Sequence, residues 1–167
     1  MSPSDTATNF DIRPVTQADV SALAWALEQL SADLGDPHRT DTATLAAACL
    51  GPGGACRGLI ARNAGTTAGA ALISPVFSTT YGAVGIYVSD LWVTAQARGS
   101  GLGRALLGAA ARLGADTWQA SFLKLTVYAE NTDAARFYDR LGFRTAARDR
   151  SCLLSGAEFS SLMEQNT

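Results

Sequence analysis

The chain has 167 residues, which is enough for one compact domain and too few for two of ordinary size. Hydrophobic residues make up 47% of it and charged residues 17%, a composition that is typical of a globular protein and excludes an intrinsically disordered one. The formal net charge is −2, and no long basic run is interleaved with aromatic residues, so we expect no nucleic-acid partner.

The longest apolar stretches are interrupted by polar or charged residues before they reach the ~18 residues that a membrane span requires. We therefore expect no transmembrane helix and no membrane partner. Residues 1–9 are polar and lack the basic start and apolar centre of a secretory signal. We expect them to form a flexible tail on a cytoplasmic protein whose single domain occupies residues 1–167.

The three cysteines and the single histidine do not form a metal-binding pattern. Cys49, Cys56 and Cys152 contain no Cys-x-x-Cys pair, and His38 has no further ligand at a recognisable spacing. We expect no metal site. Each cysteine is interpreted as a small buried apolar residue in a reduced compartment rather than as a catalytic nucleophile.

The first part of the chain predicts strands and helices in alternation. Residues 10–14 alternate apolar and polar side chains and end at a proline, as a short strand does. Thr16 is a typical N-cap, and apolar residues at helical spacing then continue to Leu34, before Gly35. The pattern further predicts a helix over residues 42–50, two strands over 58–62 and 68–77 joined by a hairpin turn, and a buried strand over 84–93.

The second part of the chain predicts helices over residues 101–116, 133–141 and 157–164, a strand over 122–128, and a hairpin of residues 143–147 and 151–154. Gly142 is a normal glycine at a helix C-terminus. Ala134, Phe137 and Leu141 lie on one helical stripe that can pack into the core. No internal repeat or linker divides the chain, so the sequence predicts an α/β sheet with helices on both faces.

A glycine-rich loop follows the buried strand. The sequence there reads Leu91-Trp92-Val93-Thr94, then Arg98-Gly99-Ser100-Gly101-Leu102-Gly103-Arg104. Backbone N–H groups at a helix N-terminus have no internal partner and lie at the positive end of the helix dipole, so they can hold an anion. Glycines let the backbone approach a diphosphate, and the two arginines can neutralise its charge. The alternative is an ordinary glycine-rich turn into a core helix.

Two nucleotide-binding patterns do not fit this loop. A nucleotide-hydrolysing P-loop ends in Gly-Lys followed by Ser or Thr, whereas Arg104 follows Gly103 here. A dinucleotide-binding fold has Gly-x-Gly-x-x-Gly early in a βαβ unit, and the glycines at 99, 101 and 103 do not have that spacing. The spacing Arg-x-x-Gly-x-Gly instead resembles the acetyl-CoA diphosphate loop of the GNAT superfamily of N-acetyltransferases.

A second motif supports this resemblance. Residues 125–143 contain a strand, Asn131 at a helix start, and Phe137-Tyr138 followed by Gly142-Phe143, which is similar to the second half-site of the superfamily. The resemblance covers most of the chain, from residue 12 through residue 143. It implies a central mixed, mostly antiparallel twisted sheet with helices on both faces, and it implies acetyl-CoA as the co-substrate.

Within the superfamily, residues 86–93 look most like the diamine and polyamine acetyltransferases, which have an acidic pair in this strand. The chain departs from that pattern because Ser89 stands in place of the first acid and only Asp90 remains. The departure puts in doubt both a polyamine substrate and a carboxylate that acts directly as the base.

Direct acetyl transfer needs three functions, and each has a candidate. The backbone N–H of Val93 can donate to the thioester oxygen. Tyr138 can protonate the leaving thiolate, since the reference pKa of tyrosine, about 10, exceeds the ~8.5 of a thiol only modestly. Asp90, the only acid in an apolar strand, can take the proton of the amine through water or orient the substrate; the alternative is a structural carboxylate bonded to backbone N–H groups.

The resemblance also implies which residues contact acetyl-CoA. Asn131 would bond the pantetheine arm, and the backbone of Leu91 and Val93 would pair with that arm as an added strand does. Ala135 and Tyr138 form a helical stripe that can face the cofactor. The implied contacts are Leu91, Trp92, Val93, Arg98, Gly99, Ser100, Gly101, Leu102, Gly103, Arg104, Asn131, Ala135 and Tyr138.

The sequence does not define the acceptor. We expect residues 31–42 and 77–83 to form the acceptor loops, because such loops vary freely on one scaffold. The expected acceptor is a primary amine of a small molecule, diamine- or polyamine-like in the first instance. The alternatives are an aminoglycoside, protein or peptide amine, or a non-catalytic acyl-CoA-binding module. A homodimer is a further expectation from the family.

Overall fold

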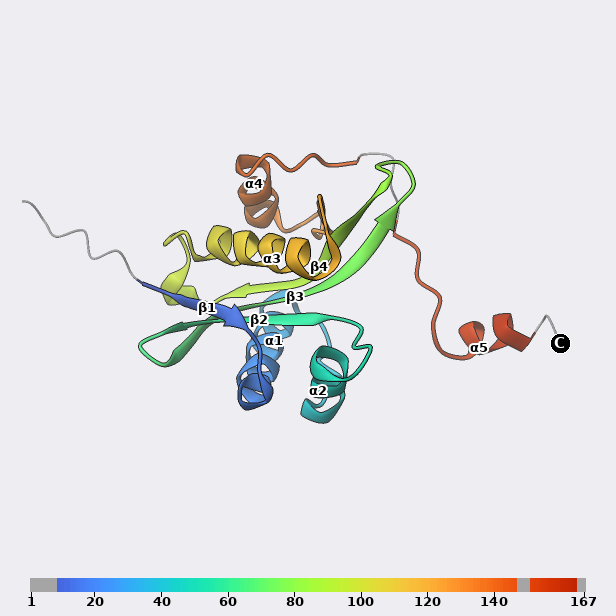
Figure 1. The fold of residues 1–167 in the computed structure, drawn as a ribbon, viewed down its shortest axis with the longest axis horizontal. Coiled ribbons are helices and arrows are strands. Elements are labelled where there is room, and N and C mark those ends of the chain that lie inside the picture. Colours follow the sequence, from blue (N-terminus) through green and yellow to red (C-terminus); the bar gives the residue numbers. More distant parts are fainter. Residues whose placement is uncertain (1–8, 147–150, 165–167) are drawn as a thin grey trace, which may run out of the picture. The chain divides into compact units, whose positions relative to one another are not determined.

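The computed structural model describes residues 9–146 and 151–164, so the expected tail falls outside it except for the exposed Asn9. The chain forms two compact units, Met1–Tyr128 and Ala129–Thr167, and each is considered by itself. Figure 1 shows the path of the chain and the labels of its elements. In the described ranges, no helix has both the length and the apolar character that a membrane crossing requires.

The first unit is built on a five-stranded sheet in the order β1-β2-β3-β4-β5. Its strands are β1 (Asp11–Pro14), β2 (Arg57–Asn63), β3 (Thr66–Ser78), β4 (Ala83–Val93) and β5 (Leu123–Leu125). The first four strands pair antiparallel, whereas β5 runs parallel to β4. The predicted mixed, mostly antiparallel sheet is confirmed, but the strand expected over residues 122–128 is shorter because its pairing ends at Leu125.

Helices cover both faces of this sheet, as the sequence predicts. Figure 1 shows α1 (Val20–Leu34) and α2 (Thr42–Leu50) on one face and α3 (Leu102–Trp118) on the other. A 3₁₀ turn, η1 (Gln17–Asp19), precedes α1, and α1 ends at Gly35, whose φ of 75° is left-handed. The carboxylate of Asp41 caps α2 by accepting a hydrogen bond of 2.7 Å from the backbone N–H of Thr44.

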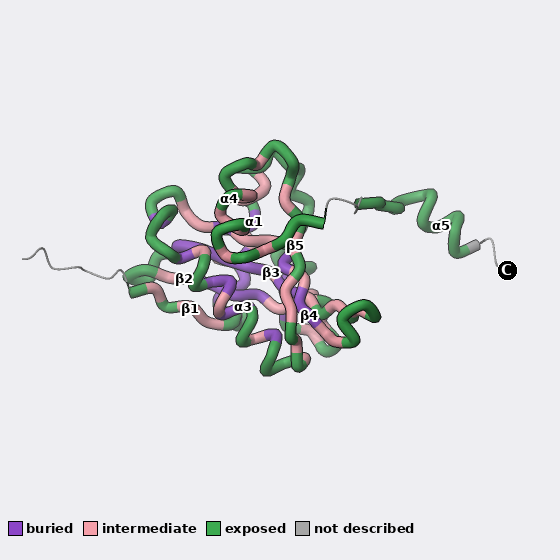
Figure 2. Tube along the Cα trace, turned by 90° about the horizontal axis from the view of Figure 1, so that it is seen from above, coloured by how far each residue is buried: buried purple, intermediate pink, exposed green. Residues whose placement is uncertain are grey.

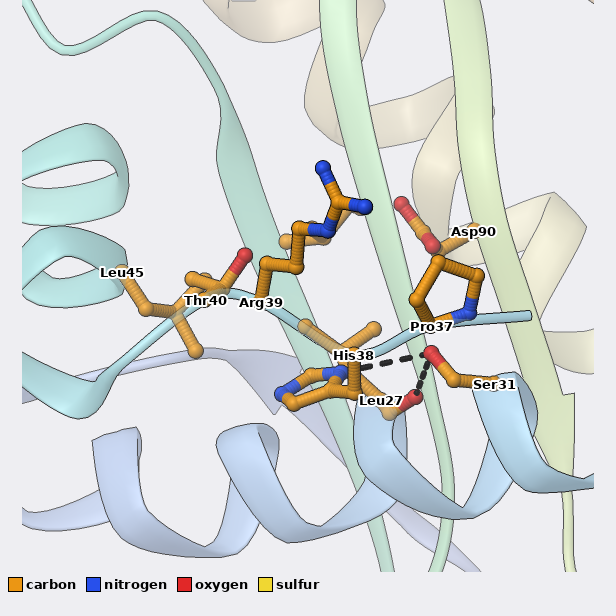
Figure 3. A pocket seen from close by; sticks show the side chains of 9 residues that line it. Leu27, Ser31, Pro37, His38, Arg39, Thr40, Leu45 and Asp90 are labelled. Atoms are coloured by element: carbon orange, nitrogen blue, oxygen red, sulfur yellow. Dashed lines mark hydrogen bonds between the residues drawn. The ribbon is translucent and has the colours of Figure 1, made fainter.

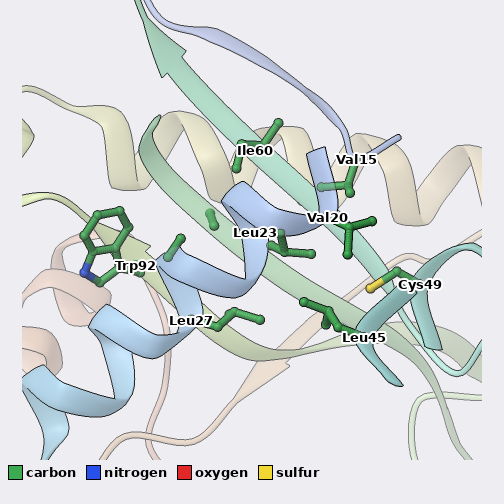
Figure 4. Packing of buried hydrophobic residues seen from close by; sticks show 10 residues of the cluster. Val15, Val20, Leu23, Leu27, Leu45, Cys49, Ile60 and Trp92 are labelled. Carbon is green, nitrogen blue, oxygen red and sulfur yellow. The ribbon is translucent and has the colours of Figure 1, made fainter. Parts of the chain in front are cut away.

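The core between α1, α2 and the sheet is a cluster of buried side chains (Figure 4). It comprises Val15, Val20, Leu23, Ala26, Leu27, Leu45, Cys49, Ile60, Ala70 and Trp92. Leu23 and Leu27 lie one helical turn apart on α1, as Leu45 and Cys49 do on α2, so both helices present an apolar stripe to the sheet. Figure 2 shows that burial is concentrated in the central strands, whereas the loops and α5 are exposed.

The opposite face holds α3 at close range because two glycines lack side chains. A Cβ on Gly69 of β3 would lie 2.8 Å from Cδ1 of Leu106, and a Cβ on Gly114 of α3 would lie 2.4 Å from Cγ2 of Ile86. A side chain at either position would force these neighbours to move, so the two glycines let the helix rest close to the strands. The start of α3, and the loop before it, are therefore fixed against β3 and β4.

A buried carboxylate anchors the beginning of α1. Asp19 is 1% exposed, and it accepts hydrogen bonds of 2.6 and 2.8 Å from Arg13 and one of 3.2 Å from Arg62. It also accepts from the backbone N–H and the hydroxyl of Thr16, at 3.0 and 2.7 Å. The hydrogen bonds from Arg13 are the main reason why the pKa of Asp19 lies well below its ordinary value. This network joins β1 and β2 to the first turn of the helix.

The second unit contains α4 (Thr132–Arg140) and α5 (Gly156–Glu164), which agree with the predicted helices to within a residue at each end. Gly142, with φ of 90°, follows α4 as expected for a helix stop. No residue of α4 is fully buried, and Ala134, Phe137 and Leu141, the stripe predicted to pack into the core, are each half-buried.

The predicted hairpin after α4 is also wrong for the residues that the structure describes. Residues 143–146 and 151–154 contain no strand, and Ala147 lies outside the described residues. A strand needs a partner for its backbone N–H and C=O groups and a surface on which to bury alternate side chains. Leu153 is 89% exposed, so the apolar residues that suggested the hairpin do not cover a core here.

Candidate active site

The loop between β4 and α3 turns through two left-handed glycines. It consists of η2 (Ala95–Ala97) and residues 98–101. Gly99 and Gly101 have φ angles of 79° and 89°, and a Cβ at either position would meet no described atom within 4 Å. The glycines therefore serve the backbone conformation and keep one side of the loop open, rather than making room for a neighbouring side chain.

This loop leaves several backbone N–H groups without acceptors. Ala97, Arg98 and Ser100 donate to carbonyl groups within the loop. Among residues 9–146 and 151–164, no acceptor is present for the N–H groups of Gly99, Gly101, Leu102, Gly103 and Arg104. These groups lie at the positive end of a 17-residue helix, which is the geometry that binds an anion.

Arg98, predicted to neutralise a phosphate, is already paired. Its Nη2 lies 2.7 Å from the carboxylate of Asp33 on α1, and its Nε donates to the carbonyl of Val93 at 3.2 Å. The indole of Trp92 donates to the same carboxylate at 3.3 Å. To hold a phosphate, Arg98 would have to exchange Asp33 for it. Arg104 is exposed and has no ion pair within the described part of the chain.

The end of β4 beside this loop has an open edge. On the side of β5 the pairing stops at Val88, and no other described strand continues it. Thr94 donates its backbone N–H to Ala68 of β3 at 2.9 Å. Because backbone groups alternate along a strand, the N–H groups of Val93 and Leu91 face away from β3, toward the open edge. An extended ligand can pair there as an added strand does.

Asp90 lines a pocket of about 240 Å³ (Figure 3). The pocket is lined by Leu27, Ser31, Pro37, His38, Arg39, Thr40, Leu45, Leu72 and Asp90. The carboxylate of Asp90 has no hydrogen bond or ion pair among the described residues, so a structural role through backbone N–H groups is not what the structure shows. A half-buried carboxylate without a partner favours a ligand that brings a positive charge or a proton.

The segment between α1 and α2 forms much of the pocket wall. Five lining residues belong to the predicted acceptor loop 31–42, and none belongs to residues 77–83. The hydroxyl of Ser31 donates to the carbonyl of Leu27 at 3.1 Å and lies 3.2 Å from Nδ1 of His38. Arg39 has no partner in the described chain, and Figure 3 shows its guanidinium at the same side of the pocket as Asp90.

His38 and Arg39 lie in the predicted acceptor loop, but the sequence analysis gave neither side chain a role in binding. Neither residue belongs to a motif, and a single charged residue in a loop usually has a solvated side chain. Their position in the chain could have indicated the pocket. A polar segment joins two helices whose apolar stripes face the same sheet, so the segment is expected to cross the end of the core between them.

The other predicted residues lie in the second unit. The side-chain oxygen of Asn131 caps α4 by accepting from the N–H of Ala134 at 3.2 Å, which leaves the amide NH₂ for another partner. The ring of Tyr138 packs edge-on against Phe137 and Phe143, with centroids 5.1 and 5.3 Å apart. This burial raises the pKa of the Tyr138 hydroxyl. The phenol therefore holds its proton at neutral pH, as a proton donor must.

The first unit thus arranges three features along residues 90–104. A carboxylate in a pocket comes first, then an open strand edge, then a cluster of unpaired N–H groups. This order fits an extended ligand with a diphosphate at one end and a reactive group at the other, next to a pocket for a basic molecule. In the described residues, no three His, Cys, Asp or Glu side chains gather closely enough to hold a metal ion.

Comparison with known protein families gives one match over most of the chain. The model of the acetyltransferase (GNAT) family matches residues 21–143. That range includes the glycine-rich loop, Asp90 and Tyr138. No curated protein sequence matches the chain.

Solved structures share the fold at low sequence identity. An integron cassette protein from the mobile metagenome of V. cholerae has a TM-score of 0.73 and 21% identity, over 93% of this chain and 98% of its own. A ribosomal-protein-alanine N-acetyltransferase from Brucella melitensis biovar Abortus 2308 has a TM-score of 0.68 and 23% identity, over 89% and 99%. An aminoglycoside N-acetyltransferase in complex with CoA has a TM-score of 0.71 and 18% identity, over 94% and 99%.

Proposed function

The chain belongs to the acetyltransferase (GNAT) family, and on that premise we propose that it transfers the acetyl group of acetyl-CoA directly to a primary amine of a small molecule bound beside Asp90. The observation that carries this proposal is the position of Asp90. Its carboxylate lines a pocket and has no partner in the part of the chain that the structure describes, and it stands on the strand that leads into the open edge and the unpaired N–H groups.

The residues after Asp90 fit acetyl-CoA, which supplies the acetyl group as an activated thioester. The unpaired N–H groups of Gly99 and of residues 101–104, together with Arg104, are proposed to hold the diphosphate. Arg98 would join them once it leaves Asp33. The backbone of Leu91 and Val93 would hold the pantetheine arm, and the free amide NH₂ of Asn131 is our candidate for a further bond to that arm.

Asp90 is proposed to bind the acceptor and then to take its proton. An ionised carboxylate in a half-buried pocket attracts an ammonium group more strongly than one in water does. Because an ammonium group cannot attack, the same oxygen atoms would first accept one of its protons, directly or through one water molecule, and leave a neutral amine as the nucleophile. With Ser89 in place of a second acid, this role rests on Asp90 alone.

Two further groups are proposed to act on the thioester. The N–H of Val93 would donate to the carbonyl oxygen as negative charge develops there, and one such donor typically contributes ~3 kcal/mol. Tyr138 would give its phenolic proton to the departing sulfur, and its raised pKa keeps that proton in place until it is needed. Ala135 lies on the same helical stripe as Tyr138 and would contact the same ligand.

The proposed acceptor is a cationic small molecule, with diamines and polyamines as the first class to test. The carboxylate of Asp90 is the support for this choice, since it offers one site for an ammonium group. Aminoglycosides are also polycationic amines, and an aminoglycoside N-acetyltransferase shares the fold. That likeness supports the fold alone, so aminoglycosides enter the test on the same footing as diamines.

Arg39 favours a second acceptor class. Its unpaired guanidinium in the wall of the same pocket would repel a second cationic centre and attract a carboxylate. An amino acid or peptide, with its amine at Asp90 and a carboxylate at Arg39, would satisfy both charges. The alternative to any catalysis is a module that binds an acyl-CoA and has lost the chemistry.

Two expectations from the family resemblance belong to the same proposal. We expect the protein to form a homodimer, which sedimentation of the purified chain would test. We also expect it to act in the cytoplasm, where acetyl-CoA and free amines are both available.

The test is a panel of amines assayed by thiol release from acetyl-CoA, with diamines, polyamines, thialysine, aminoglycosides, amino acids and short peptides. For the best acceptor, we expect Asp90→Asn to lower kcat/KM ~100-fold. Asp116→Asn on the exposed face of α3 is the matched control and should leave it unchanged. Tyr138→Phe should lower kcat with little change in acetyl-CoA affinity.

The panel also separates the alternatives. If Arg39→Gln raises KM only for acceptors that carry a carboxylate, the peptide or amino-acid class is supported. If acetyl-CoA binds but no amine in the panel releases thiol, the binding-module alternative is supported instead. Full activity of Asp90→Asn would remove the role assigned to that carboxylate.

A further inference from the structure

Two cysteines that belong to no recognised sequence motif lie in contact. Sγ of Cys49, at the end of α2, is 3.4 Å from Sγ of Cys56, just before β2. Cys56 is seven positions after Cys49, so the two do not form a Cys-x-x-Cys pattern that the sequence would reveal. Both are free thiols in the structure.

The turn between them is built to bring them together. A Cβ on Gly51 would lie 2.5 Å from the carbonyl oxygen of Ala47, and one on Gly54 would lie 2.5 Å from that of Ala48. The backbone N–H of Cys56 then donates to the carbonyl of Ala48 at 3.2 Å. Because only glycine fits at both positions, the chain can fold back tightly onto the last turn of α2.

Arg57 ties the two cysteine backbones to each other. Its Nη1 donates to the carbonyl of Cys56 at 2.9 Å and to the carbonyl of Cys49 at 3.4 Å. The guanidinium also stands over the ring of Trp118, 5.9 Å from its centroid, which limits its movement. The contact between the sulfur atoms is therefore held by the backbone on both sides and does not depend on free side-chain rotation alone.

The two thiols differ in access and in acidity. Cys49 is 2% exposed, whereas Cys56 is half-buried. The hydrogen bond with Cys49, together with the charge of Arg57, lowers the pKa of Cys56 to about 7, although burial and Asp90 act in the opposite direction. The pKa of Cys49 is raised by its hydrogen bond with Cys56 and by burial. Cys56 is thus the nucleophile that a reagent can reach, and Cys49 is the second thiol behind it.

We propose that Cys49 and Cys56 are a covalent modification site that forms an intramolecular disulfide at the expense of a low-molecular-weight disulfide such as glutathione disulfide. The Cys56 thiolate attacks one sulfur of glutathione disulfide, whose S–S bond breaks and releases one glutathione. Cys49 loses its proton, attacks Sγ of Cys56 in the mixed disulfide, and releases the second glutathione. The cysteine pair is oxidised by two electrons, and glutathione disulfide is reduced by the same two.

The required movement is small. The sulfur atoms must approach from 3.4 Å to the ~2.05 Å of a disulfide bond. Cys49 lies one helical turn after Leu45, which lines the pocket, whereas neither cysteine does. The proposal itself is independent of acetyl transfer and has a readout that needs no substrate.

The test uses the full chain carrying Cys152→Ser, which removes the exposed third thiol. The folded protein is treated with excess glutathione disulfide, and the intact mass and the free thiols are measured. We expect the loss of two hydrogen atoms, no free thiol, no attached glutathione, and a peptide map that links residues 49 and 56. Reduction by dithiothreitol should restore both thiols.

Single variants identify the order of the steps. Cys49→Ser should accumulate one glutathione on Cys56, because the second thiol is missing. Cys56→Ser should react at least tenfold more slowly, because only the buried Cys49 remains. The proposal is overturned if the parent protein stops at a stable glutathione adduct, or if the 49–56 bond appears only after denaturation. A folded control by circular dichroism accompanies each variant.

Discussion

The first turn of α2 is capped by the carboxylate of Asp41, whereas no side chain among the described residues caps the first turn of α3. The carboxylate of Asp19 accepts from the backbone N–H of Thr16 at the start of η1, the turn that leads into α1, and Asn131 caps the start of α4. At α3 the chain instead uses left-handed glycines and leaves several N–H groups unbonded. A helix N-terminus that is capped by a side chain stabilises the fold. One whose N–H groups have no acceptor can bind an external anion.

The largest loss of stability is expected at Asp19, the buried carboxylate before α1. Asp19→Asn removes the charge that faces Arg13 and Arg62, so Arg62 loses its ion pair and Arg13 keeps only the exposed Asp11 at 3.6 Å. Breaking a buried pair in this way typically costs ~3 kcal/mol or more of unfolding free energy. Urea denaturation followed by circular dichroism would measure it. A loss below ~0.5 kcal/mol would mean that this network does not anchor α1.

The same carboxylate predicts how stability depends on pH. The pKa of Asp19 is lower in the folded protein than in the unfolded chain, so its contribution is complete above the unfolded value of ~4. As pH falls below ~4 toward the folded pKa, the unfolded chain binds the proton first, and the unfolding free energy falls by up to ~1.4 kcal/mol per pH unit. Asp19→Asn should flatten this part of the curve. Equal slopes in both proteins would contradict the assignment.

The next effect concerns the open start. Gly101→Glu places a negative charge beside the unpaired N–H groups and a side chain on a backbone with φ of 89°. We expect acetyl-CoA affinity to fall at least ~100-fold, equivalent to about 2.7 kcal/mol. Gly65→Glu is the matched control, because Gly65 has φ of 81°, open space around it and a place in the distant β2–β3 turn. Calorimetric titration would compare them, and equal affinities would count against the loop.

The closed start of α2 predicts the opposite pattern. Asp41→Ala removes the acceptor for the N–H of Thr44 and should lower the midpoint of thermal unfolding by ~2–4 °C. Acetyl-CoA affinity should not change. A variant that lost affinity without losing stability would erase the distinction between the two helix starts.

The smallest effect tests the pairing of Arg98. Asp33→Asn removes the charge that competes for this guanidinium and keeps an oxygen for the indole of Trp92. We expect acetyl-CoA to bind about threefold more tightly, because an exposed ion pair no longer has to be broken. Asp36→Asn removes a nearby acid that does not touch Arg98 and serves as the control. Weaker binding in Asp33→Asn would mean that Asp33 holds Arg98 in its working position.

Features that depend on residues close together in the sequence could be predicted, whereas features that depend on distant residues could not. The bounds of α2 and the positions of β1 to β4 along the chain depend on local periodicity and turn residues, and the predictions agree with the structure to within a few residues. The loop before α3 was also readable, because glycine spacing reports backbone geometry directly. The hairpin after α4 was not, since alternation shows only that a segment suits a strand and not that a partner strand exists.

The features that sequence reasoning missed all join residues through space. Arg98 and Asp33 form an ion pair although they are 65 positions apart in the chain. In the sequence, each alone resembles an ordinary solvated charged side chain. Cys49 and Cys56 meet only because two glycines fold the turn between them. Asp90 was noticed from its composition, as an acid in an apolar strand, but its lack of a partner required the structure.

The difference between the two helix starts can be observed amide by amide. In ¹H–¹⁵N spectra recorded during titration with acetyl-CoA, we predict the largest shifts at Gly99, Gly101 and Gly103 and no shift at Thr44, which Asp41 already occupies. Inorganic diphosphate should move the same three signals in the same direction. Unchanged glycine signals under saturating ligand would show that the diphosphate is held elsewhere.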